Sequence, residues 1–144
     1  YIETDGKGSA SHTIEMPNDL RDEIHESLLG KVEDWSGIRL LPTYVYGVRI
    51  YNRGAILKPH RDREETHIIG VIINIDQKVG TPWALEIEDH QKNVHDVFLS
   101  PGEVIFYESA TLDHGRPTPL DGDKFVNVFC HYMPYIKKEL EDEV

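Results

Sequence analysis

The sequence predicts a mainly β protein, with helical support near the N-terminus and an antiparallel sandwich or barrel behind it. Apolar residues recur with helical spacing only in the region of about residues 17–35. About seven or eight short segments rich in β-branched and aromatic residues then follow at regular spacing, between about residues 43 and 134. No helical segment falls between these strands, which argues against a parallel α/β sheet. A jelly roll is the closed form of such an arrangement.

The helical support is predicted from the stretch PNDLRDEIHESLLG. Leu20, Ile24 and Leu28 recur every four residues and would form one apolar stripe. Gly30 is a candidate end for this helix. The polar residues 1–16, which precede this helix, fit either an edge strand or an arm without regular structure.

The β core is predicted over about residues 43–134. TYVYGVRIY at 43–51 is rich in β-branched and aromatic residues, and THIIGVIINID at 66–76 is an almost unbroken apolar run. ALEIED alternates apolar and polar residues, and a polar turn separates it from VHDVFL. A Ser-Pro-Gly turn precedes GEVIFYES, and KFVNVFCHY at 124–132 is the last strand. Residues 135–144 form a charged tail.

Length and composition limit the function classes. A chain of 144 residues is expected to be one domain, spanning 1–144. The net charge of −11 disfavours a nucleic-acid partner held through phosphates and suits a basic substrate. A single cysteine, Cys130, excludes an intrachain disulfide and a Cys-rich zinc site. No apolar run is long enough to cross a bilayer, so we expect no membrane partner and a soluble protein. The compartment stays open, with the cytoplasm as the default expectation.

A candidate metal centre begins in KPHRD, where His60 and Asp62 are separated by one residue. On an extended segment this spacing places both side chains on one face. His114, in LDHGRP, is a candidate third ligand. Two imidazoles and one carboxylate form the facial set of non-haem Fe(II) sites, which leaves coordination positions open. His-x-Asp is a weak signal alone, and a solvated surface loop is the alternative. The remaining histidines are expected to be structural or exposed.

A basic residue and a tyrosine extend this hypothesis. Alternation along KFVNVFCHY places Lys124 on the face that also carries Val126, Val128 and Cys130, which we expect to point inward. A cation there would need an anion, although a lysine at a strand start can also reach out to solvent. Tyr51 could donate a hydrogen bond to a carboxylate, or serve only as core.

Together these motifs resemble the 2-oxoglutarate- and Fe(II)-dependent dioxygenases, in particular the prolyl 4-hydroxylase-like branch. YNRGAILKPHRD is similar to the family segment that leads into His-x-Asp, and SPGEVIFYES to the strand before the distal histidine. GDKFVNVFCHY is similar to the closing strand, which opens with a basic residue. The resemblance covers about residues 44–134 and implies a double-stranded β-helix (jelly-roll) core.

The resemblance also implies roles for individual residues. His60, Asp62 and His114 would be the catalytic iron ligands, Lys124 would pair with the distal carboxylate of 2-oxoglutarate, and Tyr51 would hydrogen-bond this co-substrate. Arg116 would face the substrate or the co-substrate, or brace a neighbour, and Arg49 and Trp83 are further candidates for substrate binding. Fe(II), 2-oxoglutarate and O2 are the implied cofactors, with ascorbate as a further candidate.

The implied reaction is hydroxylation of an unactivated C–H bond, with succinate and CO2 as co-products. A prolyl residue in a peptide or protein is the expected substrate. The same chemistry on an Asn, Asp or Lys residue, a small molecule or a nucleobase is an alternative, because fold and triad do not choose between them. An alternative from another class is a non-catalytic jelly-roll binding module.

Overall fold

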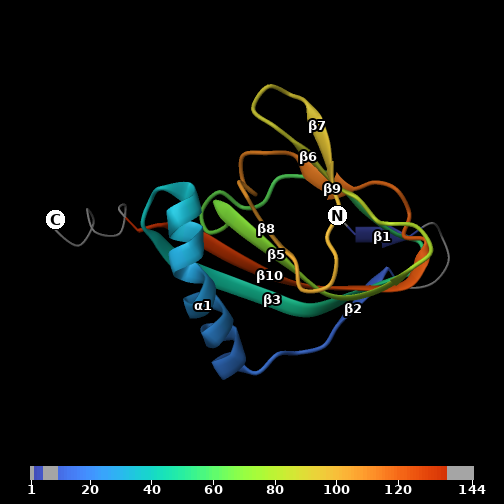
Figure 1. Ribbon diagram of the computed structural model, residues 1–144, viewed down its shortest axis with the longest axis horizontal. Helices are drawn as coiled ribbons and strands as arrows, with labels where there is room; N and C mark the ends of the chain where they lie inside the picture. Colours follow the sequence, from blue (N-terminus) through green and yellow to red (C-terminus); the bar gives the residue numbers. More distant parts are fainter. Residues whose placement is uncertain (1, 5–9, 136–144) are drawn as a thin grey trace.

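Two five-stranded sheets face each other in the computed structural model, which describes residues 2–4 and 10–135 (Figure 1). The major sheet has the order β2-β3-β10-β5-β8, and all of its pairings are antiparallel. Its strands are β2 (Ser11–Thr13), β3 (Leu40–Asn52), β10 (Gly122–Pro134), β5 (Ile69–Val79) and β8 (Val104–Tyr107).

The minor sheet has the order β1-β4-β9-β6-β7 and is also antiparallel throughout. Its strands are β1 (Ile2–Thr4), β4 (Ala55–His60), β9 (His114–Arg116), β6 (Leu85–Glu88) and β7 (Val94–Val97). The predicted jelly-roll arrangement is confirmed, and the β core begins at Leu40, slightly earlier than expected. The N-terminal arm supplies one edge strand to each sheet.

Among the described residues the helix is α1 (Asn18–Ser36), which packs against the major sheet on the side away from the minor sheet (Figure 1). Val32 is completely buried and Ile24 packs against the same core, whereas Leu20 is exposed. The apolar stripe therefore starts one turn later than predicted. The helix also runs through Gly30 and ends at Gly37, whose left-handed backbone (φ 75°) lets its N–H reach the carbonyl of Glu33.

Strand β10 is the centre of the major sheet and is covered on both faces. Val128, Cys130 and Tyr132 pack toward α1, while Phe125 and Phe129 face the interior between the two sheets. Since buried apolar side chains lie on both faces of the strand, alternation alone does not reveal which face borders a cavity.

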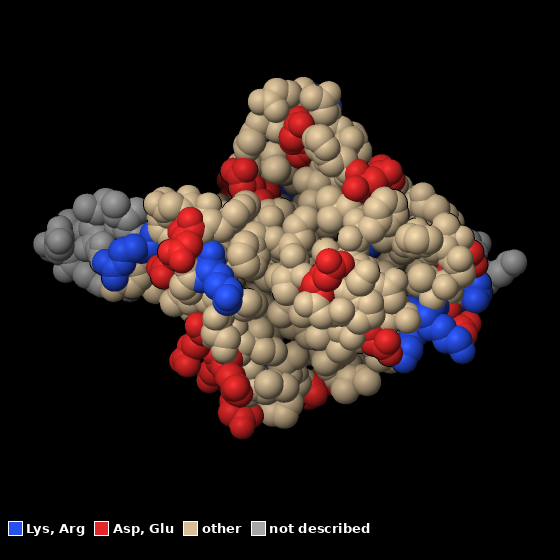
Figure 2. All heavy atoms as spheres, viewed as in Figure 1, with Lys and Arg blue, Asp and Glu red and all other residues tan. Residues whose placement is uncertain are grey.

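Acidic side chains dominate the charged surface over the start of α1 (Figure 2). Within the described residues, no helix combines the length and apolar composition that a membrane span requires. Apart from Tyr135, the predicted charged tail lies outside the described residues.

Candidate metal centre

The histidines of the predicted triad come from neighbouring strands. His60 ends β4, His114 begins β9, and the two residues are partners in the pairing of these strands. Gly115 permits this close approach, because a Cβ at that position would lie 2.7 Å from the carbonyl oxygen of Leu57 in β4. Asp62 follows β4, and its backbone N–H donates to the carbonyl of Ser109 at 2.8 Å. Sheet pairing therefore brings together residues more than fifty positions apart.

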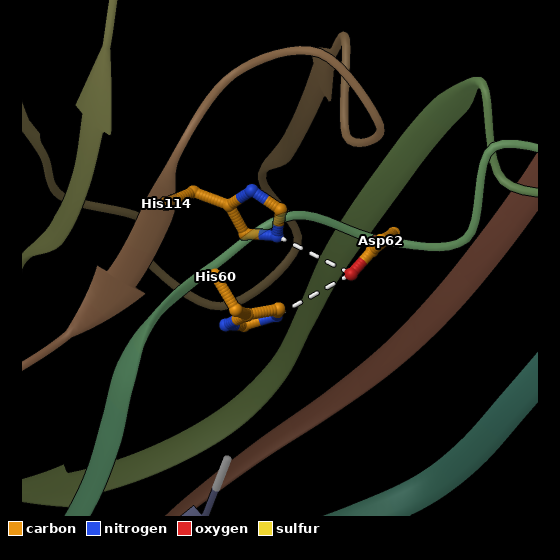
Figure 3. Close-up of side chains that lie close together, drawn as sticks. All are labelled: His60, Asp62 and His114. Carbon is orange, nitrogen blue, oxygen red and sulfur yellow. Dashed lines mark ion pairs between the residues drawn. The ribbon is translucent and has the colours of Figure 1, made fainter.

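The three side chains converge on one point (Figure 3). Asp62 Oδ1 lies 3.3 Å from His60 Nε2 and 3.6 Å from His114 Nε2. One ligand atom from each residue lies within 4.8 Å of the others. Ligands about 2.1 Å from a shared ion and at right angles would be about 3 Å apart. The three atoms are thus close to the spacing that one ion requires.

Backbone carbonyls hold both imidazoles in the form that suits a metal ligand. His60 Nδ1 lies 2.8 Å from the carbonyl oxygen of Lys58, and His114 Nδ1 lies 2.9 Å from that of Leu112. A carbonyl only accepts hydrogen bonds, so each Nδ1 must carry the proton. Each Nε2 therefore faces Asp62 and is the nitrogen left to ligate an ion, as in histidines that ligate metals.

The carboxylate of the triad is ionised at neutral pH. Burial raises the pKa of Asp62, but hydrogen bonds and charge from His114 and His60 lower it more, so the pKa lies well below its usual value. An ionised carboxylate can ligate a cation without first losing a proton.

A cavity of about 290 Å³ opens at the triad, between the two sheets. Apolar and aromatic side chains cover much of its wall, and the polar groups converge on a few positions, which is typical of small-molecule sites. The residues that line the cavity include His60, Asp62, His114, Tyr51, Arg49 and Arg116, together with Tyr46, His67, Tyr107 and His131.

Lys124 is not in this cavity, so its predicted inward orientation is wrong. Its ammonium pairs with the carboxylate of Asp76 at 2.7 Å, and both side chains are about half exposed. The reason is that β10 presents Phe125, Phe129 and His131 to the interior, so that Lys124 lies on the opposite face. The alternation was predicted correctly, but the face that borders the cavity was not.

The buried cation of the cavity is Arg116, on β9. Its side chain is 2 % exposed, and its Nη1 donates to the carbonyl of Trp83 at 2.7 Å. Its guanidinium carbon lies 4.8 Å and 4.7 Å from the ring centroids of Trp83 and Phe125. Trp83 is not among the residues that line this cavity and packs against Arg116 instead, so its role in substrate binding stays a prediction.

Tyr51 and Arg49 both line the cavity from β3, in agreement with their shared strand parity. Tyr51 is fully buried, its ring meets Trp83 edge to face, and burial raises its pKa. Arg49 is partly buried and its Nη1 donates to Ser11 Oγ at 3.3 Å. Their roles in binding stay predictions.

Sequence reasoning missed two histidines of the cavity wall, His67 and His131. Their ring centroids are 4.0 Å apart, and His131 Nδ1 lies 4.0 Å from Asp62 Oδ2. His131 Nδ1 is buried and has no hydrogen-bond partner. Burial and the neighbouring His67 lower the pKa of His131 to about 3, so it is neutral at pH 7. The sequence did contain one indication of His131, which lies two residues after Phe129 and therefore on the same face of the last strand. This indication is useful only once the structure shows which face of β10 borders the cavity.

The donor set fits a first-row divalent metal ion. Two neutral imidazoles and one carboxylate suit Fe(II) and leave coordination positions open to ligands in the cavity. Two buried polar atoms, Arg116 Nη2 and His131 Nδ1, lack hydrogen-bond partners at this cavity, which indicates that a further polar ligand belongs there. The arrangement is able to bind a metal ion together with a small anionic molecule.

Comparisons with known proteins identify the class of fold. No family model and no curated protein matches the sequence. The crystal structure of an oxidoreductase of the 2OG-Fe(II) oxygenase family from Burkholderia pseudomallei matches 83 % of this chain with a TM-score of 0.60 and 12 % identity. The match covers 59 % of that oxidoreductase, so the chain spans less than two thirds of its length. A cupin domain from Bordetella pertussis Tohama I matches 65 % of this chain and 93 % of its own, with 18 % identity and a TM-score of 0.38. The chain therefore has a double-stranded β-helix (jelly-roll) fold and shares it with an oxidoreductase of the 2OG-Fe(II) oxygenase family.

Proposed function

We propose that the chain is a 2-oxoglutarate- and Fe(II)-dependent dioxygenase that hydroxylates an unactivated C–H bond, with succinate and CO2 as co-products. The observation that carries the proposal is the convergence of His60 Nε2, His114 Nε2 and Asp62 Oδ1 inside a cavity. The fold shared with the Burkholderia oxidoreductase supports it as an analogy.

The protein supplies binding and orientation in this reaction, while bound Fe(II) and 2-oxoglutarate supply the oxidising chemistry with O2. His60, Asp62 and His114 would hold the ion. The carbonyls of Lys58 and Leu112 fix the two imidazoles, and Tyr107 packs edge to face against His114 with ring centroids 4.9 Å apart. The buried aromatic walls would limit the access of water to the reacting groups.

The proposed substrate is a prolyl residue in a peptide or protein. An aromatic shelf of Tyr44, Tyr46, His67 and His131 runs from the cavity wall to the surface, with the rings of Tyr44 and Tyr46 stacked. Tyr44 and Tyr46 are 43 % and 37 % exposed, so a ligand can reach them. Proline has no N–H to donate, and its recognition depends on packing of the ring, which aromatic faces provide. The net charge of −11 favours a basic peptide.

Turnover of 2-oxoglutarate tests the proposal. The protein is loaded anaerobically with Fe(II), supplied with 2-oxoglutarate and ascorbate, exposed to O2, and assayed for succinate. Asp62→Ala removes a ligand and should reduce succinate formation by at least about 100-fold. Asp96→Ala, a carboxylate on the exposed strand β7, should leave it unchanged. Wild-type rates in Asp62→Ala would contradict the ligand assignment. Metal binding without turnover would favour the non-catalytic module.

A panel of peptides tests the substrate. Matched peptides that differ only in a central Pro, Asn, Asp or Lys are incubated with the loaded enzyme, and mass spectrometry detects a gain of one oxygen atom. We expect oxygen only on the prolyl peptide, and more of it when the flanking residues are basic. Oxygen on another residue type would keep the chemistry and reject the prolyl assignment.

A further inference from the structure

A second cavity, of about 350 Å³, lies beside the metal centre, and we call it the rim pocket. It is lined by Arg61, Asp62, Arg63 and His67. Two of these residues, Asp62 and His67, also line the cavity that contains the triad. The two cavities therefore share a wall, and a substrate whose reacting atom lies at the metal centre can extend into the rim pocket.

Backbone hydrogen bonds fix the loop that forms the rim pocket. The N–H of Asp62 donates to the carbonyl of Ser109 at 2.8 Å, and the N–H of His67 donates to the carbonyl of Arg63 at 2.9 Å. Ser109 Oγ also donates to the carbonyl of His67 at 2.7 Å. The backbone on both sides of Arg63 is thus held in place, which lowers the cost of ordering this loop around a ligand.

The rim pocket contains a cation that lacks an anionic partner. Arg61 Nε donates to Asp113 Oδ1 at 2.9 Å, whereas no carboxylate of the described residues pairs with Arg63. Burial is the main influence on the pKa of Tyr46, which it raises, and on that of His67, which it lowers; the charge of Arg63 lowers both. The guanidinium therefore lies near these two rings. An exposed arginine is solvated and needs no partner for stability, so Arg63 is available to a ligand.

Arg63 and the aromatic shelf present a cation and an apolar surface side by side. The rings of Tyr44 and Tyr46 are stacked, with centroids 5.8 Å apart. The paired N–H donors of a guanidinium match the two oxygens of a carboxylate. Consecutive Cα atoms of a peptide are about 3.8 Å apart, and Arg63 directly follows the metal ligand Asp62. When one substrate residue lies at the metal centre, its neighbour is therefore within reach of Arg63.

We propose that Arg63 binds a side-chain carboxylate on the substrate residue next to the one that reacts, so that the site selects peptides with Asp or Glu beside the target. This inference rests on the proposed function and deepens it. The preference is local, because the acidic side chains that favour a basic peptide lie over the start of α1 (Figure 2). Basic residues further along the peptide still meet that acidic surface.

Binding of matched peptides to the Mn(II)-loaded protein tests the proposal. Isothermal titration calorimetry under anaerobic conditions, with 2-oxoglutarate present, compares capped peptides that carry Asp or Asn directly before or directly after a central proline. The protein's net charge of −11 repels the additional negative charge, so without the rim pocket the Asp peptide would bind no better than the Asn peptide. Wild type should bind the Asp peptide about fivefold more tightly in one of the two positions, the upper range for an exposed ion pair.

Charge reversal separates recognition from a structural role. Arg63→Gln should bind the Asp and Asn peptides equally, and Arg63→Glu should prefer Lys over Asn at the same position. A residue with only a structural role would not exchange one charge preference for the other. Arg53→Gln is the matched control, since it removes the same charge from a residue that pairs with Asp121 and Asp123 and lines neither cavity. It should keep the wild-type preference, and unchanged Mn(II) affinity in each variant shows that the metal site is intact.

A further pair of peptides, which end at the proline with a free or an amidated C-terminus, identifies the source of the carboxylate. A preference confined to the free terminus would overturn the side-chain assignment.

The outcomes separate this inference from the proposed function. A wild-type protein without preference for Asp, a preference that survives in Arg63→Gln, or one that disappears in Arg53→Gln overturns the role of Arg63 and leaves the dioxygenase proposal standing. Failure to bind any of the peptides overturns the role of Arg63 together with the peptide substrate. Selective binding of the Asp peptide by a protein that forms no succinate when loaded with Fe(II) leaves the rim pocket standing and overturns the proposed function.

Discussion

Replacement of Arg116 by methionine tests whether the buried guanidinium serves ligand binding or stability. Arg116 is among the largest fully buried side chains of the protein. Truncation of a large buried aromatic side chain usually costs about 3–5 kcal/mol. Methionine is a flexible apolar residue that can fill much of the same space between Trp83 and Phe125.

The expected effect follows from three opposing contributions. Burial lowers the pKa of Arg116 from 12.5 to about 10, which corresponds to a cost of about 3 kcal/mol for keeping the charge in the interior. Methionine removes this cost. It also removes two cation–π contacts, worth about 1 kcal/mol each, and leaves the Trp83 carbonyl without its donor, a loss of about 1 kcal/mol. The contributions nearly cancel, so the free energy of unfolding should stay within about 1 kcal/mol of wild type.

Urea denaturation of the metal-free protein, followed by circular dichroism, measures this free energy. Phe125→Ala is the control, because Phe125 packs on the same guanidinium and is 1 % exposed. It should lose about 3–5 kcal/mol. A loss of more than about 3 kcal/mol in Arg116→Met would refute the reasoning, since Arg116 would then be a structural cation rather than one kept for a ligand.

Two further predictions concern the metal site and the pH dependence of stability. Gly115→Ala places a Cβ against the β4 backbone and should displace β9, which lowers the affinity for Mn(II) by about tenfold or more in a calorimetric titration. Gly30→Ala is the control, because a Cβ there meets nothing within 4 Å, and it should leave the affinity unchanged. His25 donates through Nε2 to the Tyr44 carbonyl, and burial lowers its pKa below 6.5 although the hydrogen bonds and Asp22 oppose this. Its unfolded form takes up a proton first as the pH falls, so His25 contributes full stability above about pH 6.5 and loses it below. His25→Gln keeps a donor without the titration, and its free energy of unfolding should fall less than that of wild type between pH 7.5 and 5; an equal fall would show that other groups carry the dependence.

Much of the fold could be predicted from local patterns. The helix and the β core follow from apolar spacing and β-branched composition, and the jelly-roll arrangement follows from the absence of helices between strands. The spacing of His60 and Asp62 on an extended segment was sufficient to place both on one face. The start of the apolar stripe at Leu20 and the end of α1 at Gly30 were wrong, because sheet packing decides which helical turns are covered.

The sequence by itself determined the class of fold and the candidate ligands: helical support near the N-terminus, a set of antiparallel strands, and two imidazoles with one carboxylate. Only the tertiary structure decided which cation belongs to the cavity. In a strand covered on both faces, such as β10, apolar side chains point both ways, so alternation fixes relative orientation and not direction. Lys124 consequently reaches solvent and Asp76, while Arg116 enters the interior because β9 directs it to the same side as His114. That choice depends on contacts between residues far apart in the chain, which no local pattern records.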